Sequence, residues 1–321
     1  MGIGGKGKSV LGQILLLSAT VVWGSSFIIL KETISALPAL YVIAVRFLAS
    51  GVLLCFIFFK KIRAINKTAL LQGVILGTFL ALAYIMQTTG LKHISAGKNA
   101  FITSLYCVIC PFMLWLTDGV KPKSYNLISA VLCVAGVGFI VLSGAKDDGG
   151  NFYLGSALTF GGAVFFALQI IFTGKYHQKK ADTVQLLTVQ LLTAGLIVGA
   201  CSLAFELPFC VISAYAIDGD QILRIAYLTL VCTLYAQLAQ MIGLKFTGAN
   251  MAAVILTLEA VFAVIFSLIL GKEKLTALLI VGFAVIFVGT LISELKVDFG
   301  KLFRQKSEKN NAAQGGFDKD E

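Results

Sequence analysis

The chain has 321 residues, of which 58% are hydrophobic and only 13% are charged. A soluble domain carries about 25% charged residues and could not bury so much apolar surface, so the composition excludes an ordinary soluble fold. The net charge of +10 would suggest a nucleic-acid partner in a soluble protein. Here the charges lie in short loops between apolar runs, so they indicate membrane topology, and no nucleic-acid partner is expected.

Ten apolar runs follow one another along the chain, each continuous and about 20 residues long. Continuous runs favour helices, whereas a membrane barrel would show alternating apolar and polar residues. The sequence therefore predicts an all-α integral membrane protein with ten transmembrane helices. The expected spans are 10–30, 39–59, 69–91, 96–116, 124–143, 153–173, 184–205, 222–244, 248–270 and 275–294.

The loops between these spans carry most of the lysine and arginine residues. With the N-terminus placed in the cytoplasm, 18 of them fall on the cytoplasmic side and 7 on the outer side. Cytoplasmic loops of membrane proteins are enriched in these residues, so both termini are expected in the cytoplasm and the chain in the cell membrane. The polar segment 297–321 is expected to be a disordered cytoplasmic tail.

An internal repeat divides the chain into two five-helix units, at 1–145 and 150–296. The motif Gln-x-x-Gly-Leu-Lys occurs at 87–92 and again 153 positions later at 240–245. A shift of 143 positions brings Leu11-Gly12 onto Leu154-Gly155. Because five is an odd number of spans, the second unit enters the membrane from the opposite side, which predicts inverted repeats. Such repeats favour transport over catalysis, because exchanging their conformations opens a central site to either face.

Two ionisable residues are expected deep within spans, where charged groups are costly and mark functional sites. Glu259 lies ~16 Å from the inner boundary and Arg46 ~10 Å from the outer boundary, at ~1.5 Å per residue. Arg46 is therefore a structural ion-pair candidate with Glu259, or it extends outward to the membrane surface. Glu259 could alternatively bind a substrate amine or a coupling proton.

Polar side chains recur at helical spacing on spans that the repeat relates to one another. They predict a polar central cavity, and the alternative is a set of interhelical hydrogen bonds worth about 0.6 kcal/mol each. Trp23 and Phe166 are equivalent under the shift of 143 positions and lie near mid-span. The substrate-cavity candidates are Trp23, Tyr84, Gln87, Asn99, Thr103, Gln169, Gln237, Gln240 and Glu259.

Several kinds of site have no support in the sequence. His93 and His177 fall on opposite sides of the membrane, so no metal site is expected. The pair Cys107-x-x-Cys110 lies inside an apolar run and is interpreted as two small apolar residues. No phosphate-binding loop is present, so no cofactor or ATP-driven step is expected. Pro111 is expected to bend the fourth span.

Four short motifs resemble EamA-type members of the drug/metabolite transporter superfamily. They are Trp23-Gly24-Ser25-Ser26-Phe27, Arg46-Phe47, Leu258-Glu259-Ala260-Val261-Phe262 and Gly271-Lys272-Glu273-Lys274. The resemblance covers about residues 10–295. It implies ten helices in two inverted repeats, alternating access, and often export of amino acids or related metabolites. The chain departs from the family pattern at Ala260, where a proline is common, and at Lys121, where members often have glutamate.

These features together predict a secondary transporter of small polar metabolites, with amino acids or related compounds as cargo and export as the direction. Its expected partners are a small-molecule substrate, membrane lipids and coupling protons, and it is expected to be a monomer or a homodimer. One alternative is a lipid-modifying membrane enzyme, which would need His, Asp or Glu clustered at one face. Another is a transporter of nucleotide sugars or drugs, although phosphorylated cargo favours several basic residues and only Arg46 is available.

Overall fold

The computed structural model describes residues 3–144, 151–179, 181–206, 218–247, 249–271 and 276–295, and these residues form helices and no strand. The helices of the first half are α1 (Ile3–Ala36), α2 (Ala39–Ile57), α3 (Phe59–Arg63), α4 (Lys67–Leu91), α5 (Ala96–Ser104), α6 (Tyr106–Asp118) and α7 (Ser124–Gly144). Those of the second half are α8 (Phe152–Gln178), α9 (Thr183–Phe205), α10 (Gly219–Thr229), the π-helix η3 (Leu230–Tyr235), α11 (Ala236–Thr247), α12 (Ala249–Ile269) and α13 (Ala277–Glu294).

The protein is an all-α multi-pass integral membrane protein. Seven helical segments in the described part of the chain are long and apolar enough to cross a membrane. Three shorter apolar helices lie at Ser124–Ile140, Leu258–Ile269 and Ala277–Ile292. Large apolar side chains on the outer surface, such as Phe56 and Val134, are more than 70% exposed, as residues that face lipid must be. The expected tail at 297–321 lies outside the described residues.

Short polar residues set where several helices begin. The side-chain oxygen of Asn66 accepts a hydrogen bond from the Ala69 N–H, and Asn151 and Asp218 cap α8 and α10 in the same way. Such caps satisfy backbone N–H groups that have no partner in the first turn. Apolar content predicted where the spans lie, and these caps fix the residues at which the three helices begin.

Glycines bring pairs of helices into close contact between the two halves. A Cβ added to Gly90 on α4 would lie 2.7 Å from the carbonyl oxygen of Gly155 on α8. A Cβ on Gly243 of α11 would lie 2.6 Å from Leu16 Cγ and 3.0 Å from the carbonyl oxygen of Gly12 on α1. The third span of each half therefore packs closely on the first span of the other half.

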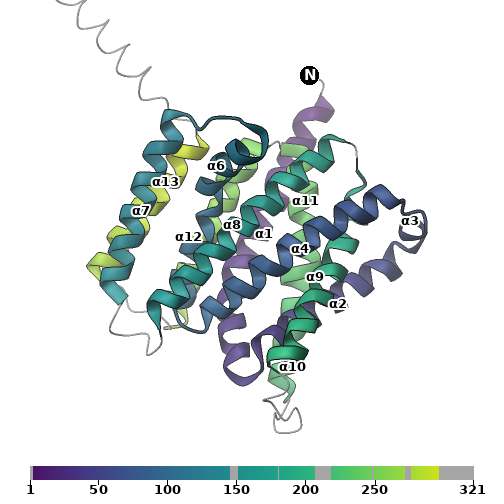
Figure 1. Cartoon of the computed structure of the whole chain (residues 1–321), viewed down its shortest axis with the longest axis horizontal. Coiled ribbons are helices and arrows are strands. Elements are labelled where there is room, and N and C mark those ends of the chain that lie inside the picture. Colours follow the sequence, from purple (N-terminus) through teal and green to yellow (C-terminus); the bar gives the residue numbers. More distant parts are fainter. Residues whose placement is uncertain are drawn as a thin grey trace, which may run out of the picture.

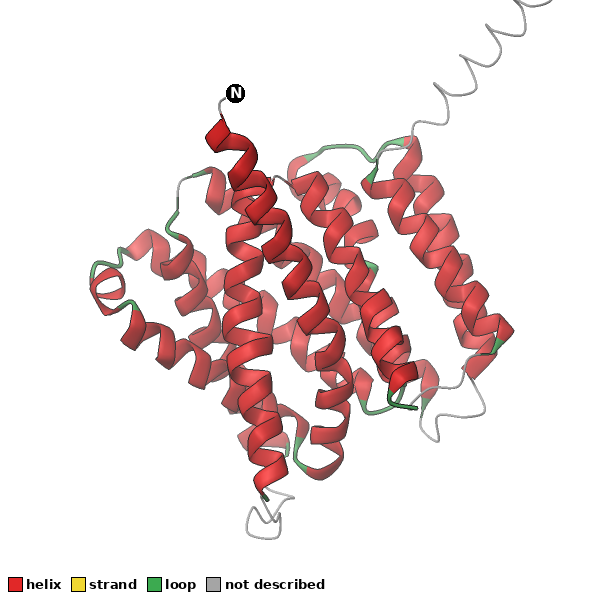
Figure 2. Cartoon of the chain, turned by 180° about the vertical axis from the view of Figure 1, so that it is seen from behind, coloured by secondary structure: helices red, strands yellow, loops and turns green. Residues whose placement is uncertain are grey.

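The helices surround the centre of the molecule from two sides. In Figure 1, α4 and α8 cross the near face, and α7 and α13 form a closely packed pair at one edge. Seen from behind in Figure 2, α1 starts at the end marked N and packs on α11 and α12. Polar side chains from α4 and α8 on one side, and from α1, α11 and α12 on the other, line a cavity between these two groups of helices.

Two spans are irregular, each in a different half. The fourth span is divided into α5 and α6 at Leu105, whose N–H bonds to the carbonyl oxygen of Ile102 at 3.2 Å. Pro111 lies inside α6, six residues beyond this division, and the expected bend of the fourth span at Pro111 stays a prediction. The eighth span contains η3, a segment with wider i→i+5 hydrogen bonding that the sequence analysis did not expect.

Candidate functional site

A cavity lies at the centre of the helices, where the two halves meet. The space open to the centres of water-sized molecules is about 50 Å³. Eight of the nine cavity candidates line it together with Arg46, and the exception is Asn99. The full lining is Trp23, Ser26, Phe27, Leu30, Arg46, Leu80, Tyr84, Gln87, Thr103, Tyr106, Phe166, Gln169, Ile170, Gln237, Gln240 and Glu259.

The lining residues pair up under the registers of the internal repeat. A shift of 153 positions relates Tyr84 to Gln237, Gln87 to Gln240 and Tyr106 to Glu259. A shift of 143 positions relates Trp23 to Phe166, Ser26 to Gln169 and Phe27 to Ile170. Ser26, Phe27, Tyr106 and Ile170 were absent from the candidate list. Applying the repeat register to the candidates Gln169 and Glu259 would have found Ser26 and Tyr106, whereas Phe27 and Ile170 are equivalent only to each other.

Arg46 is held inside the protein by a hydroxyl group and two aromatic rings. Its Nε donates a hydrogen bond to Thr233 Oγ1 at 2.7 Å. Its guanidinium carbon lies 5.4 Å from the ring centroid of Tyr84 and 5.6 Å from that of Phe47, within the range of a cation–π interaction. Only 1% of the residue is exposed, so Arg46 does not extend to the membrane surface.

No ion pair joins Arg46 to Glu259 within the described part of the chain, so the expected structural pair is absent from this conformation. Both side chains line the same cavity, Arg46 from α2 and Glu259 from α12. Among the described residues, the carboxylate of Glu259 makes no hydrogen bond, and Nε provides the only one of Arg46. The cavity therefore presents one basic and one acidic side chain, and neither has a charged partner among the described residues.

Four glutamine side chains contribute to the neutral polar lining. Gln87 Nε2 donates to Thr103 Oγ1 at 3.0 Å, and Gln169 Nε2 lies 3.3 Å from both Thr173 Oγ1 and the side-chain oxygen of Gln190. Among the described residues, no donor reaches the buried side-chain oxygen of Gln237. A buried acceptor of this kind requires a donor from water or a bound molecule.

Asn99 lies behind the wall of the cavity, where it joins three helices. Its Nδ2 donates to the backbone oxygen of Gln87 at 3.2 Å and to Thr159 Oγ1 at 2.8 Å. The residue is fully buried. These contacts connect α5 to α4 and α8, and they correspond to the interhelical hydrogen bonds that were the alternative to a cavity position.

Aromatic side chains form the apolar part of the wall. Trp23 Nε1 donates to the carbonyl oxygen of Cys232 at 2.9 Å, which fixes the indole against η3. Tyr84 packs edge-on against Phe47 and Phe166, with ring centroids 4.9 and 5.2 Å away. The cavity thus combines rigid aromatic faces with a few convergent polar groups, which is typical of small-molecule sites.

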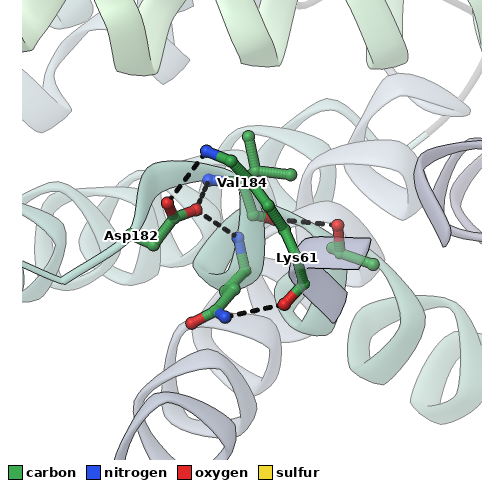
Figure 3. Close-up of polar contacts among 5 residues, drawn as sticks. Lys61, Asp182 and Val184 are labelled. Atoms are coloured by element: carbon green, nitrogen blue, oxygen red, sulfur yellow. Dashed lines mark hydrogen bonds and ion pairs between the residues drawn. The ribbon is translucent and has the colours of Figure 1, made fainter. Parts of the chain in front are cut away.

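Ion pairs connect the helix ends on either side of the cavity. At the end that holds the N-terminus, Lys61 pairs with Asp182 at 3.0 Å (Figure 3), and Lys175 pairs with Asp118 at 2.6 Å. Partial burial alone would raise the pKa of Asp182, but the hydrogen bonds from the Gln185 N–H and from Lys61 outweigh it. The pKa of Asp182 therefore lies below its ordinary value.

Ion pairs and hydrogen bonds also connect the helices at the opposite end. Glu206 accepts hydrogen bonds from the backbone N–H groups of Leu40 and Tyr41 at the start of α2 and pairs with Lys92 at 3.2 Å. Arg224 pairs with Glu32 at 2.8 Å. These contacts connect α2, α4 and α9 with one another and join α1 to α10.

The described residues include no group of three or more His, Cys, Asp or Glu side chains placed to hold a metal ion. Six cysteines in the same part of the chain, Cys107 and Cys110 among them, form no disulfide with one another. The lining of the cavity offers recognition by charge, hydrogen bonding and aromatic contact.

Comparison with known proteins gives one consistent result. The EamA-like transporter family matches residues 10–142 and matches again over 153–295. An uncharacterized transporter of Archaeoglobus fulgidus is 28% identical over 298 residues, which cover 90% of this chain and 88% of the relative. The uncharacterized transporter YvbV of Bacillus subtilis is 26% identical over 180 residues, 56% of this chain and 58% of the relative. A crystal structure with 16% sequence identity shares the fold at a TM-score of 0.63, over 88% of this chain and 97% of its own.

Proposed function

Because the chain belongs to the EamA-like transporter family, we propose that it is a secondary transporter that exports small zwitterionic metabolites, amino acids foremost, across the cell membrane. The observation that carries the proposal is the central cavity, in which Arg46 and Glu259 face a common space without pairing to each other. Membership of the family supports the role as a transporter, and the basic and acidic side chains in the cavity support a zwitterionic substrate.

The proposed architecture is ten spans in two inverted five-helix repeats with both termini in the cytoplasm. Seven long apolar segments and three shorter ones in the described chain support the count. The double family match, at 10–142 and 153–295, supports two repeats of similar length. The reciprocal glycine contacts of α4 with α8 and of α11 with α1 support a two-fold relation between them.

A zwitterion fits the cavity because it supplies the counter-charge that each side chain lacks. A guanidinium binds a carboxylate through parallel N–H···O bonds, and the two terminal nitrogens of Arg46 are available for this. The carboxylate of Glu259 would accept hydrogen bonds from the ammonium group. Buried charges without partners are costly, so occupancy by a zwitterion relieves that cost at both ends of the ligand.

The size of the cavity indicates that this conformation is contracted. A space of about 50 Å³ holds about four waters, at roughly 10–15 Å³ each. An amino acid with a side chain needs more room, so the helices must separate before it binds. Inverted repeats provide such a movement by alternating access, and the absence of a phosphate-binding loop from the sequence leaves a gradient of substrate or protons as the driving force.

Thermal stabilisation of the purified protein tests the cargo class. A compound that binds only the native state at 100 times its Kd stabilises it by about 2.7 kcal/mol. We expect this effect from one or more standard L-amino acids. The matched amino alcohol lacks the carboxylate and the matched carboxylic acid lacks the amine, so both should give much smaller shifts. Equal shifts from all three compounds, or none from any amino acid, would overturn the zwitterion proposal.

A further inference from the structure

Three buried polar side chains from the first half bond to η3 and to Thr229, the last residue of α10 directly before it. Trp23 Nε1 donates to the carbonyl oxygen of Cys232 at 2.9 Å, and Ser50 Oγ donates to that of Thr229 at 2.9 Å. Arg46 Nε donates to Thr233 Oγ1 at 2.7 Å. A π-helical segment displaces carbonyls from the regular i→i+4 pattern, which makes them available to such donors.

The Thr233 hydroxyl is fixed in orientation by a second hydrogen bond. It donates to the carbonyl oxygen of Leu228, five residues earlier, at 2.8 Å. Its proton is committed to this bond, so its lone pairs face Arg46. The residue is fully buried and does not line the cavity, so its contact with the substrate space is indirect, through the guanidinium.

The bond to Nε decides which edge of the guanidinium remains for a ligand. Arginine has five N–H donors in a planar fork, one on Nε and four on the terminal nitrogens. With Nε held by Thr233, the edge formed by the two terminal nitrogens remains, and these nitrogens make no hydrogen bond with the described residues. The rings of Tyr84 and Phe47 restrain the plane of the group from the side. A carboxylate can then bind end-on through two parallel bonds.

This arrangement occurs in one half of the molecule and has no counterpart in the other. A shift of 153 positions relates Thr233 to Leu80, and a shift of 143 relates Arg46 to Val189. The counterpart of η3 in the first half lies within α4, which is a regular helix. The π-helical segment η3 and the buried Arg46 that bonds to it therefore occur in the same place, and neither occurs at the equivalent place. A purely structural role for η3 would not require this coincidence.

From these contacts, and on the basis of the proposed transport of zwitterions, we infer that Thr233 is a positioning residue for substrate recognition. It holds the guanidinium of Arg46 so that its terminal edge meets the carboxylate of the cargo. The specificity for a carboxylate thus depends on η3 as well as on Arg46 itself.

The test compares Thr233→Val, which removes the hydroxyl at nearly constant volume, with Thr233→Ser, which keeps it. The ligands are the twenty standard L-amino acids, screened one at a time, and the amino alcohol of the strongest binder. Thr290→Val is the matched control, because Thr290 is equally buried and donates to the carbonyl oxygen of Ile286 at 2.8 Å, on α13. Thr233→Ala serves as a second variant if the valine does not fit.

We expect Thr233→Val to weaken amino-acid binding about fivefold to tenfold, as the loss of one buried hydrogen bond predicts. Binding of the amino alcohol should stay within twofold, because that ligand has no carboxylate for Arg46 to bind. Thr233→Ser and Thr290→Val should both bind the amino acid within twofold of the wild type. An unchanged affinity in Thr233→Val, or equal losses for both ligands, would overturn the inference.

A second measurement keeps this inference separate from the proposed function. In ¹⁵N-arginine-labelled protein, the Nε–H signal of Arg46, assigned by its loss in Arg46→Lys, should be protected from water exchange. We expect protection to disappear in Thr233→Val and to persist in Thr233→Ser, without any ligand. Protection that survives in Thr233→Val would refute the positioning role. If protection behaves as expected but no amino acid binds the wild type, the proposed cargo falls, and with it the role of Thr233 in recognising that cargo.

Discussion

The two halves of the chain surround one cavity with equivalent spans, yet they are irregular in different places. In the first half the third span, α4, is regular and the fourth breaks at Leu105. In the second half the third span contains η3 and the fourth, α12, runs without a break. Repetition thus sets where the spans lie, while the local sequence of each half sets the chemistry that it presents. The basic side chain, Arg46, comes from the first half and the acidic one, Glu259, from the second.

A second difference lies where the third and fourth spans of one half meet the first span of the other. In the junction of α4, α5 and α8, Asn99 bonds to the backbone of Gln87 and to Thr159. The residues equivalent to Asn99 and Thr159 are Ala252 and Leu16. Leu16 packs in an apolar cluster with Ala236 and Ala239 of α11. A polar contact in one junction therefore corresponds to an apolar contact at the equivalent position of the other, whose polar bonds, such as that of Trp23 to Cys232, lie elsewhere along the helices.

The largest expected effect tests what the two junctions share, the close approach of helices at glycine. Gly90→Ala and Gly243→Ala each place a methyl group against backbone and side-chain atoms of the facing helix. Each should lower the free energy of unfolding by up to about 3 kcal/mol, because overpacking forces the helices apart. Thermal unfolding in detergent measures the loss. Gly174→Ala is the control, since a Cβ there has open space around it, and it should not destabilise.

If only one of the two glycine variants is destabilised, the halves do not share this packing, and the two-fold relation fails at the junctions. Equal losses in both would support it.

Replacing Asn99 by alanine gives its junction the residue type found at the equivalent position, Ala252. Asn99→Ala removes two buried hydrogen bonds and leaves a small cavity, so it should destabilise the protein by about 2 kcal/mol. Ser104→Ala on the same helix removes only a local bond to the Phe101 carbonyl, at 2.7 Å, and should cost less than about 0.6 kcal/mol. Chemical or thermal unfolding of both variants gives the comparison. Equal small losses would show that Asn99 does not hold the junction.

A smaller effect is expected at the start of α9, where the two halves meet through Lys61 and Asp182. Asp182 caps the helix by accepting from the Val184 and Gln185 N–H groups. Asp182→Ala should cost about 1 kcal/mol and Asp182→Asn much less, because asparagine also caps helices. The ion pair is largely exposed, so it adds little to this figure. A difference between the two variants in unfolding temperature measures the cap.

The pH dependence of the same site gives the smallest expected effect. The pKa of Asp182 is lower in the folded protein than its ordinary value. A depressed pKa means that the carboxylate contributes stability above the ordinary pKa of about 4 and loses it as the pH falls through the folded value. The stability difference between wild type and Asp182→Asn should therefore shrink below about pH 4. A difference that stays constant across this range would contradict the low folded pKa.

The sequence predicted most of the lining of the cavity but few of the bonds inside it. Apolar runs and the repeat register located Trp23, Gln87, Gln240 and Glu259, because helical periodicity brings polar groups on matched spans to one face. The partner of Arg46 was missed because a hydroxyl on η3 reaches it, and π-helical segments have no simple sequence signature. Asn99 shares its face with Thr103, so periodicity alone could not separate a wall residue from one behind the wall.

Counterflow into proteoliposomes tests most directly whether the cavity carries a zwitterion between its two charges. Vesicles that hold wild-type protein and are preloaded with the amino acid giving the largest thermal stabilisation should take up its radiolabelled form. Arg46→Gln and Glu259→Gln should each lower this uptake about tenfold to a hundredfold, since each removes a charge-assisted bond worth about 1.5–3 kcal/mol. Uptake by both variants at the wild-type rate would contradict the assignment of Arg46 and Glu259 to the two ends of the substrate.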